Sequence, residues 1–193
     1  MIRVTAPGKM VLLGEYAVLD GAPSMVAAVN RRVAVDLVPS SGTGWVISSP
    51  GFGGPVAEFE FDGRGGLRWR DQASRRRYSL VDGILKVLAN GPLADLAAPP
   101  GFEAVLDSRE FFFAAPGGSL KLGLGSSAAL TVALITALAS RDGGPPPEGP
   151  SWLEMLIGVH RDIQGGLGSG IDVAASVHGG VLSFRLDRKL GPT

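Results

Sequence analysis

The sequence predicts an α+β fold, with strands concentrated in the N-terminal part of the chain and helices in the C-terminal part. Short apolar or alternating runs, separated by turns rich in glycine and proline, fill most of the first 70 residues, a pattern typical of antiparallel strands. From residue 79 onward, apolar residues recur mainly at helical spacing. Two of these helices follow directly on glycine-rich stretches. We therefore expect a sheet packed against helices, with functional loops where the glycine-rich stretches meet the helices.

Composition restricts the classes of function. The chain has 193 residues, a hydrophobic content of 45%, a formal net charge of zero and no cysteine. These values describe a globular protein that can bury a sizeable core, without the basic excess of a nucleic-acid-binding protein. The lack of cysteine excludes disulfides and thiolate metal sites and favours a cytoplasmic location. No signal-peptide core is present at the N-terminus, and the most apolar helical stretch, 128–139, is too short to span a membrane.

The expected strands lie in order along the chain. They cover residues 2–6, 10–13, 24–30, 32–38, 45–48, 56–61, 67–70, 102–106 and 181–186. Pro7 and Gly8 are a turn signal that separates the first two strands, and residues 14–23 are expected to form a loop. The plain expectation for this region is antiparallel pairing.

The expected helices cover residues 80–88, 128–139 and 152–164, with a fourth after residue 170. Asn90, Gly91 and Pro92 end the first helix, and residues 143–150, rich in glycine and proline, form an exposed connection. The basic run 75–77 precedes the first helix; it is either solvated surface or a contact for an anionic substrate. The aromatic run 111–113 is expected in the core.

Lys9 is the first candidate functional residue. It stands beside a glycine between two apolar runs. It is either a lysine that reaches solvent from a turn or a phosphate-binding lysine held at a strand junction. Glu15, in the loop that follows, is either an ordinary surface acid or a group that fixes a nearby hydroxyl.

The stretch 121–129 is the main candidate for ligand binding. Gly123 and Gly125 allow the backbone to lie close against a ligand, and Ser126 or Ser127 is placed as the N-cap of the apolar helix that follows. The N–H groups and the positive dipole end of that helix suit a phosphate group, although a purely structural turn has the same pattern. The spacing does not match a Walker A loop.

A second glycine-rich loop, 165–170, opens a second apolar helix with one acid, Asp172, in its first turn. An acid at this position is favoured by the helix dipole whether or not it has a function. Asp172 is therefore either a helix-stabilising acid or a functional carboxylate.

Three stretches, 6–18, 121–129 and 168–172, together resemble the GHMP kinases, the superfamily of galactokinase, homoserine kinase, mevalonate kinase and phosphomevalonate kinase. Their order and separation match over nearly the whole chain. Within the superfamily the sequence looks most like phosphomevalonate kinases, because Lys121 begins the glycine loop where mevalonate kinases usually have small residues. The run 164–174 also looks more like phosphomevalonate kinases.

The resemblance implies a fold similar to domain 2 of ribosomal protein S5, with a mixed sheet, packed helices and a left-handed βαβ crossover. It also implies ATP and Mg²⁺ as cofactors. The implied nucleotide-binding residues are Lys121, Gly123, Leu124, Gly125, Ser126, Ser127 and Ala128, with the Ser127 hydroxyl on Mg²⁺. The implied substrate-binding residues are Lys9, Glu15, Gly168, Ser169 and Asp172, of which Lys9 and Asp172 are catalytic.

The resemblance implies a phosphotransferase that converts phosphomevalonate to diphosphomevalonate. The alternatives are a mevalonate kinase and a truncated, non-catalytic nucleotide-binding domain. The domain expected is a GHMP kinase N-terminal domain over 1–193, without the C-terminal domain and its third glycine-rich motif, so we expect the chain alone to show little turnover. A small-molecule substrate is expected, with no nucleic acid or membrane, and with a second copy or a separate C-terminal half as partner. Mevalonate kinases hold magnesium partly through a glutamate before the catalytic aspartate, whereas His160, Arg161 and Asp162 stand here.

Overall fold

The computed structural model describes residues 1–50, 55–97, 101–116 and 118–186. Seven strands form one mixed sheet in the order β1-β2-β6-β3-β4-β5, with β9 paired to β2. The strands are β1 (Ile2–Leu13), β2 (Ser24–Pro39), β3 (Trp45–Ser48), β4 (Ala57–Phe61), β5 (Leu67–Trp69), β6 (Phe102–Asp107) and β9 (Val181–Phe184). All pairs are antiparallel except β3 with β6. The expected antiparallel pairing is therefore confirmed apart from this one parallel pair.

The first two strands are longer than the sequence predicts. The turn expected at Pro7 and Gly8 is wrong: β1 runs through it, and the pairing register shifts between these two residues. Proline lacks an N–H group, but β1 is an edge strand, where an irregularity at proline is tolerated. The break expected near residue 31 is also wrong, because β2 is continuous and pairs with β9 at its start and with β6 at its end. Tertiary pairing on both sides overrides the local signal.

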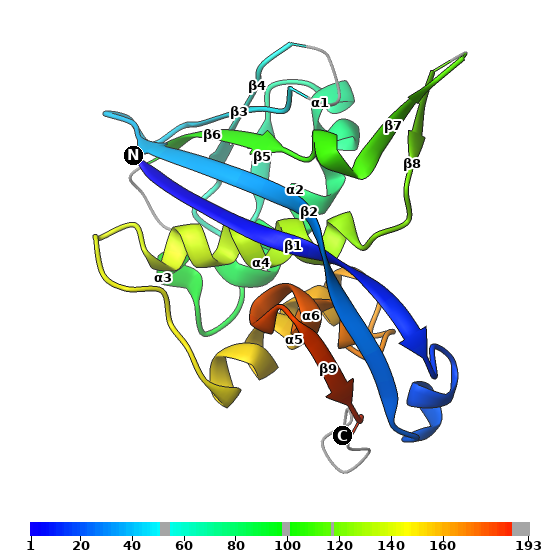
Figure 1. Cartoon of the computed structure of the whole chain (residues 1–193). Coiled ribbons are helices and arrows are strands. Elements are labelled where there is room, and N and C mark those ends of the chain that lie inside the picture. The colour runs from blue at the N-terminus through cyan, green and yellow to red at the C-terminus, as the bar shows by residue number, and fades with distance from the viewer. Residues whose placement is uncertain (51–54, 98–100, 117, 187–193) are drawn as a thin grey trace.

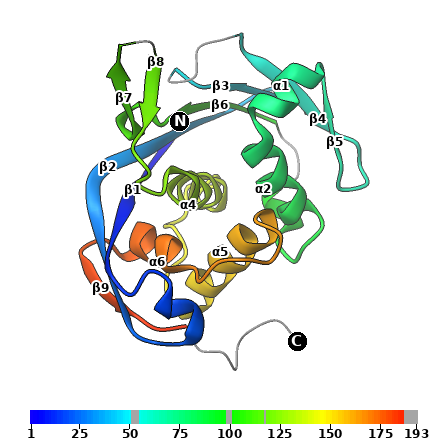
Figure 2. The ribbon, with the colours of Figure 1, turned by 90° about the vertical axis from the view of Figure 1, so that its right-hand side faces the viewer.

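The helices lie together on one side of the curved sheet, which wraps around α4 (Ser126–Ala139) (Figure 1; Figure 2). The other helices are α1 (Gln72–Arg77), α2 (Ser79–Ala89), α3 (Ala94–Ala97), α5 (Pro150–Ile163) and α6 (Ile171–His178), with short 3-10 turns η1 (Ala17–Asp20) and η2 (Arg109–Phe111). The α4 helix is the centre of the core, since buried residues occur on nearly every side of it. Within the described part of the chain, no helix is both long and apolar enough to cross a membrane.

Helices α1 and α3 and one hairpin were not expected from the sequence. The basic run 75–77 precedes α2, as expected, but it also forms the end of the unexpected helix α1, which Asp71 caps by accepting a hydrogen bond from the Ser74 N–H at 2.7 Å. A two-stranded hairpin of β7 (Phe112–Ala115) and β8 (Gly118–Lys121) leads into the first glycine-rich loop.

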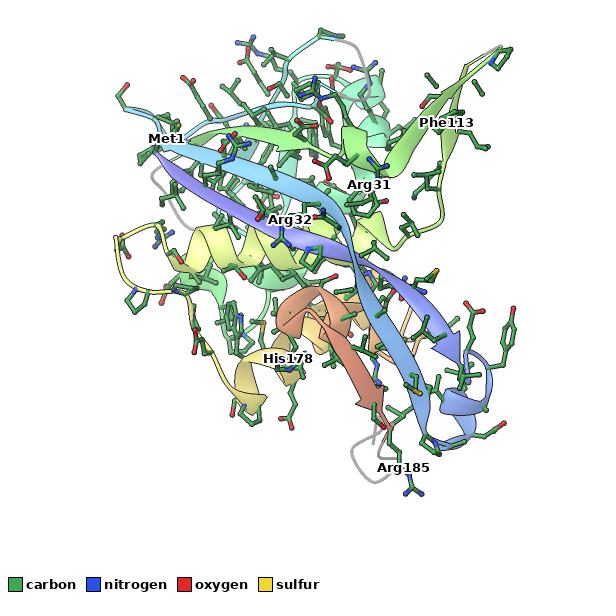
Figure 3. The ribbon with its side chains drawn as sticks, viewed as in Figure 1. Met1, Arg31, Arg32, Phe113, His178 and Arg185 are labelled. Atoms are coloured by element: carbon green, nitrogen blue, oxygen red, sulfur yellow. The ribbon has the colours of Figure 1, made fainter. Side chains whose placement is uncertain are left out.

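The expectation that the whole aromatic run 111–113 lies in the core is wrong for its last residue. Phe111 is buried, whereas Phe113 is 60% exposed and lies on the projecting hairpin (Figure 3). The alternation of a strand turns successive side chains to opposite faces, and the hairpin projects beyond the core. The left-handed crossover stays a prediction.

Candidate active site

The first glycine-rich loop ends at Gly125, which is the N-cap of α4 and has φ of 76°. The expectation that a serine caps this helix is therefore wrong, because Ser126 and Ser127 already lie in its first turn. Glycine adopts the left-handed conformation of this N-cap without the steric cost that serine would carry. No side chain caps the helix, so its first N–H groups are available to an anion.

Strand β1 holds Lys9 against this loop. The Lys9 N–H donates a hydrogen bond of 2.8 Å to the carbonyl oxygen of Leu124. A Cβ on Gly8 would lie only 2.5 Å from that same oxygen, and a Cβ on Gly125 would lie 2.9 Å from Lys9 Cγ. Glycine at both positions is therefore what allows strand and loop to approach this closely, and the aliphatic part of the Lys9 side chain passes directly over Gly125.

The second glycine-rich loop ends at Gly170, whose φ is 84° and which is the N-cap of α6. Asp172 lies in the first turn of this helix and is partly buried. One turn later, the buried Ser176 hydroxyl donates a hydrogen bond of 2.8 Å to the carbonyl oxygen of Pro7 in β1. Residues four apart lie on the same helix face, so Asp172 also lies on the face of α6 that packs against β1.

The two loops open on the same side of the molecule. Figure 2 looks onto this side, where the chain enters both α4 and α6 facing the viewer. Lys9 and Asp172 therefore border the space in front of the two helix N-termini, although no ion pair joins them among the described residues. Two helix dipoles, a lysine and a carboxylate at one opening can bind a polyanion and position a second reactant.

His160 on α5 lies behind Asp172. Its side chain is buried, and its Nε2 has no hydrogen-bond partner among the described residues. Burial lowers the pKa of His160, and the negative charge of Asp172 partly opposes this effect. The imidazole is therefore neutral at physiological pH and adds no second charge behind the carboxylate.

Arg161, the next residue, holds the second loop. Its Nε and Nη2 each donate a hydrogen bond of 2.9 Å, to the carbonyl oxygens of Gly168 and Ser169 respectively. This role was not predicted from the sequence, where residues 160–162 indicated only the lack of a glutamate. A single arginine at the end of a helix, just before a glycine-rich loop, is the signal that could have indicated it.

The remaining candidates have fewer contacts. Ser169 is buried, and its Oγ accepts a long hydrogen bond of 3.4 Å from the Ile171 N–H, whereas Gly168 is exposed. Lys121 at the end of β8 and Glu15 beyond the end of β1 are both exposed. Neither side chain has a hydrogen bond or ion pair to the described residues, so neither is tied to the other candidates by such a contact.

A magnesium site made only of protein side chains is not present in the described residues, since no three His, Cys, Asp or Glu side chains gather as a metal site. Mg²⁺ often keeps one or two protein ligands and takes its other oxygens from substrate phosphates and water. The Ser127 hydroxyl, in the first turn of α4, and the Asp172 carboxylate suit that limited role. The donor set therefore fits a metal that arrives with a nucleotide.

Comparison with known proteins identifies the class to which the chain belongs. The profile of the family described as GHMP kinases N terminal domain matches residues 80–180, which include α4, α6 and both glycine-rich loops. The chain belongs to this family.

Two kinds of kinase resemble it comparably. The mevalonate kinase of Methanothermobacter thermautotrophicus is 33% identical over 192 residues, covering 96% of this chain and 51% of the relative. The phosphomevalonate kinase of a Streptomyces species is 31% identical over 188 residues, covering 93% of this chain and 48% of the relative. The chain thus spans about half the length of the curated relatives it matches.

Solved structures agree on the fold. The mevalonate kinase of Methanococcus jannaschii superposes with a TM-score of 0.71 at 19% identity, over 95% of this chain and 53% of that one. The phosphomevalonate kinase of Streptococcus pneumoniae, solved in complex with phosphomevalonate and AMPPNP, gives a TM-score of 0.65 at 20% identity, over 92% of this chain and 47% of that one. These matches confirm the predicted α+β architecture, a mixed sheet packed against helices.

Proposed function

We propose that this chain is the nucleotide-binding half of an ATP-dependent kinase that phosphorylates phosphomevalonate to diphosphomevalonate. The observation that carries the proposal is the uncapped N-terminus of α4, held against Lys9 by the hydrogen bond from its N–H to Leu124. N–H groups at a helix N-terminus, approached by a lysine, suit the phosphates of a nucleotide. Asp172 lies in the first turn of α6, the second helix that begins after a glycine-rich loop.

In this proposal the backbone from Gly123 to Ser127 binds the ATP phosphates, and the Lys9 ammonium lies near the transferred phosphoryl group. An oxygen of the acceptor forms a bond to the γ-phosphorus while the bond to the leaving ADP oxygen breaks. Such transfers need positioning and charge neutralisation more than covalent participation by the protein. When bound, Mg²⁺ supplies neutralisation of the phosphate charge, with Ser127 and Asp172 as its candidate protein ligands.

The chemistry of the acceptor sets the role of Asp172. The phosphate of phosphomevalonate has a second pKa near 6 and is mostly a dianion at neutral pH, so it attacks without losing a proton to the protein. Asp172 then orients Lys9 and the acceptor. Two phosphates that meet also require cations, which Lys9 supplies directly and Lys121 supplies once a ligand draws it in.

Mevalonate is the second candidate acceptor, because the mevalonate kinase of M. thermautotrophicus is as similar to the chain as the phosphomevalonate kinase is. A hydroxyl acceptor must lose a proton, and Asp172 is the carboxylate placed to take it. General-base catalysis contributes about 10²- to 10⁴-fold to a rate. The two acceptors therefore differ in how strongly turnover depends on Asp172.

The test is a steady-state assay of ADP release by the natural polypeptide that carries this domain, with each acceptor in turn. We expect a larger kcat/KM for phosphomevalonate, and we expect Asp172→Asn to lower kcat much less for it than for mevalonate. Asp95→Asn is the matched control, since Asp95 also lies in the first turn of a helix, α3, outside the site. A larger kcat/KM for mevalonate would overturn the acceptor assignment, and ATP binding without turnover on either acceptor would favour a non-catalytic domain.

We further propose that the apolar residues around the end of β1 form the surface that a C-terminal half covers, and through which copies of this chain associate when that half is absent. Leu13 is 65% exposed and Tyr16 is 80% exposed, with further exposed apolar side chains beside them. The additional exposed residues are Met10, Leu12, Leu19 and Met25. Adjacent exposed apolar residues are typical of a contact surface.

A further inference from the structure

The loop between α5 and α6 is built from residues with little conformational restraint of their own. Four of its glycines have φ in the left-handed region, which glycine reaches without steric cost. They are Gly165 at 74°, Gly166 at 83°, Gly168 at 103° and Gly170 at 84°. A backbone of this kind needs an external contact to hold one conformation, because glycine loses more conformational entropy on ordering than any other residue.

The strongest such contact is the Arg161 guanidinium. Its two hydrogen bonds of 2.9 Å reach the carbonyl oxygens of Gly168 and Ser169, the last two residues before the N-cap of α6. The other hydrogen bonds of the loop are local: the Gly166 N–H bonds to the Arg161 carbonyl at its start, and the long Ser169 bond lies at its end. No carboxylate of the described residues pairs with Arg161, so its charge is directed to these two carbonyls.

At one point, Gly170, the loop is held by side-chain packing. Gly170 lies against Ile157, one helical turn before Arg161, since a Cβ on Gly170 would come within 2.7 Å of Ile157 Cγ2. Next to this contact, a cavity of about 430 Å³ separates α5 from the end of β9, and both Arg161 and Ser169 line it. Side-chain packing therefore does not support the loop on that side, and the guanidinium bridges the space.

We propose that Arg161 is a positioning residue that fixes the carbonyls of Gly168 and Ser169 and thereby orients the first turn of α6, which carries Asp172. Nε and Nη2 lie on one edge of a planar group and match two neighbouring acceptors, whereas a lysine ammonium acts as a point donor. These hydrogen bonds show that Arg161 holds the loop. The effect of Arg161 on turnover rests on the function proposed for Asp172.

The first experiment measures amide hydrogen exchange across the 193-residue chain for wild type, Arg161→Gln and Arg161→Lys. We expect exchange at residues 166–172 to accelerate in Arg161→Gln and to accelerate less in Arg161→Lys, with α4 unchanged. The matched control is Arg109→Gln, because Arg109 uses its own Nε and Nη2 on the carboxylate of Asp107, in another part of the fold.

The second experiment measures kcat and KM in the natural polypeptide that carries this domain. We expect Arg161→Gln to lower kcat by about 10- to 100-fold, the range that a small misplacement of a reacting group can cost. The KM for ATP should stay near the wild-type value, because Lys9 and Leu124 hold the first glycine-rich loop independently. Arg161→Lys should recover part of kcat, and free guanidinium ions should partly rescue Arg161→Ala.

The outcomes separate this proposal from the function on which it rests. Unchanged exchange at 166–172 in Arg161→Gln would overturn the positioning role, as would a lower kcat without faster exchange. If exchange is faster in Arg161→Gln but the wild-type protein turns over neither acceptor, the result would support the role of Arg161 in holding the loop and would overturn the proposed kinase activity. If Arg161→Gln does not fold, Arg161→Lys, which keeps the charge but acts as a point donor, tests the role through its smaller expected acceleration of exchange at 166–172.

Discussion

Replacing Gly8 by alanine tests most sharply the contact between β1 and the first glycine-rich loop. An added Cβ would lie 2.5 Å from the Leu124 carbonyl oxygen and 2.5 Å from Phe111 Cε1, whereas ordinary contacts begin at 3.4 Å. One of these neighbours is backbone and the other belongs to a buried ring, so neither can move aside cheaply. The strand and the loop must separate instead.

The cost follows from the two interactions that this separation disturbs. Forcing an additional carbon into a packed site typically costs about 1–3 kcal/mol. Loss of the hydrogen bond between the Lys9 N–H and the Leu124 carbonyl, now 2.8 Å long, adds about 0.5–1.5 kcal/mol. We therefore expect Gly8→Ala to lower the free energy of unfolding by about 1.5–4.5 kcal/mol and to weaken ATP·Mg binding, because the loop no longer lies against Lys9.

Urea unfolding and titration calorimetry measure the two effects. Gly144→Ala is the matched control, because a Cβ there meets nothing within 4 Å and the residue does not need a positive φ. Its free energy of unfolding should change by no more than about 0.5 kcal/mol. A Gly8→Ala protein with the stability and the ATP affinity of the wild type would refute the close contact between strand and loop.

Three further predictions follow. Gly125→Ala should weaken ATP·Mg binding about tenfold or more in calorimetry, because it adds left-handed strain of about 1–2 kcal/mol and a Cβ 2.9 Å from Lys9 Cγ. The control is Gly143→Ala, where φ is 82° and the space around the residue is open. This control variant should lose stability without a change in ATP affinity. Since burial holds the pKa of His160 below its ordinary value of 6.5, the unfolded chain takes up a proton first, and the free energy of unfolding should fall as the pH drops below about 6.5. His160→Asn should remove this dependence and the exposed His178→Asn should retain it, so an identical pH profile for His160→Asn would contradict the assignment. The 193-residue chain should self-associate with rising concentration in light scattering, and Leu13→Ser with Tyr16→Ser should reduce this, whereas a strictly monomeric wild type would speak against the proposed contact surface.

The local sequence pattern was sufficient to predict the strands and helices whose apolar residues recur at a regular spacing. The alternation of Val33, Val35 and Leu37 within 32–38 predicted a strand, and the apolar run 128–139 predicted a helix, because the spacing of buried residues differs between strands and helices. The same pattern could not show that β2 is continuous, since its continuity depends on pairing with β6 and β9, two strands far away in the sequence.

The two glycine-rich loops of the candidate site were predictable from the sequence. Gly125 and Gly170 indicated both loops because each has a positive φ at the start of a helix. The identity of the N-cap was not predictable, since serine is the commoner cap and only the left-handed turn at Gly125 decides against it. The role of Arg161 was not predictable either, because its hydrogen bonds reach carbonyls seven and eight residues away, and any residue can provide a carbonyl.

An amide NMR titration of the 193-residue chain with ATP·Mg tests the proposed nucleotide site most directly. We expect the largest shift changes on residues 123–128 and on the Lys9 amide, with smaller changes at the start of α6 near Asp172. The separate cavity between α2 and α5, lined by Asn90 and Met155, should show no change. Shifts concentrated at that cavity, or no shifts at 123–128 in a folded chain, would contradict the central claim that the N-terminus of α4 is the nucleotide site.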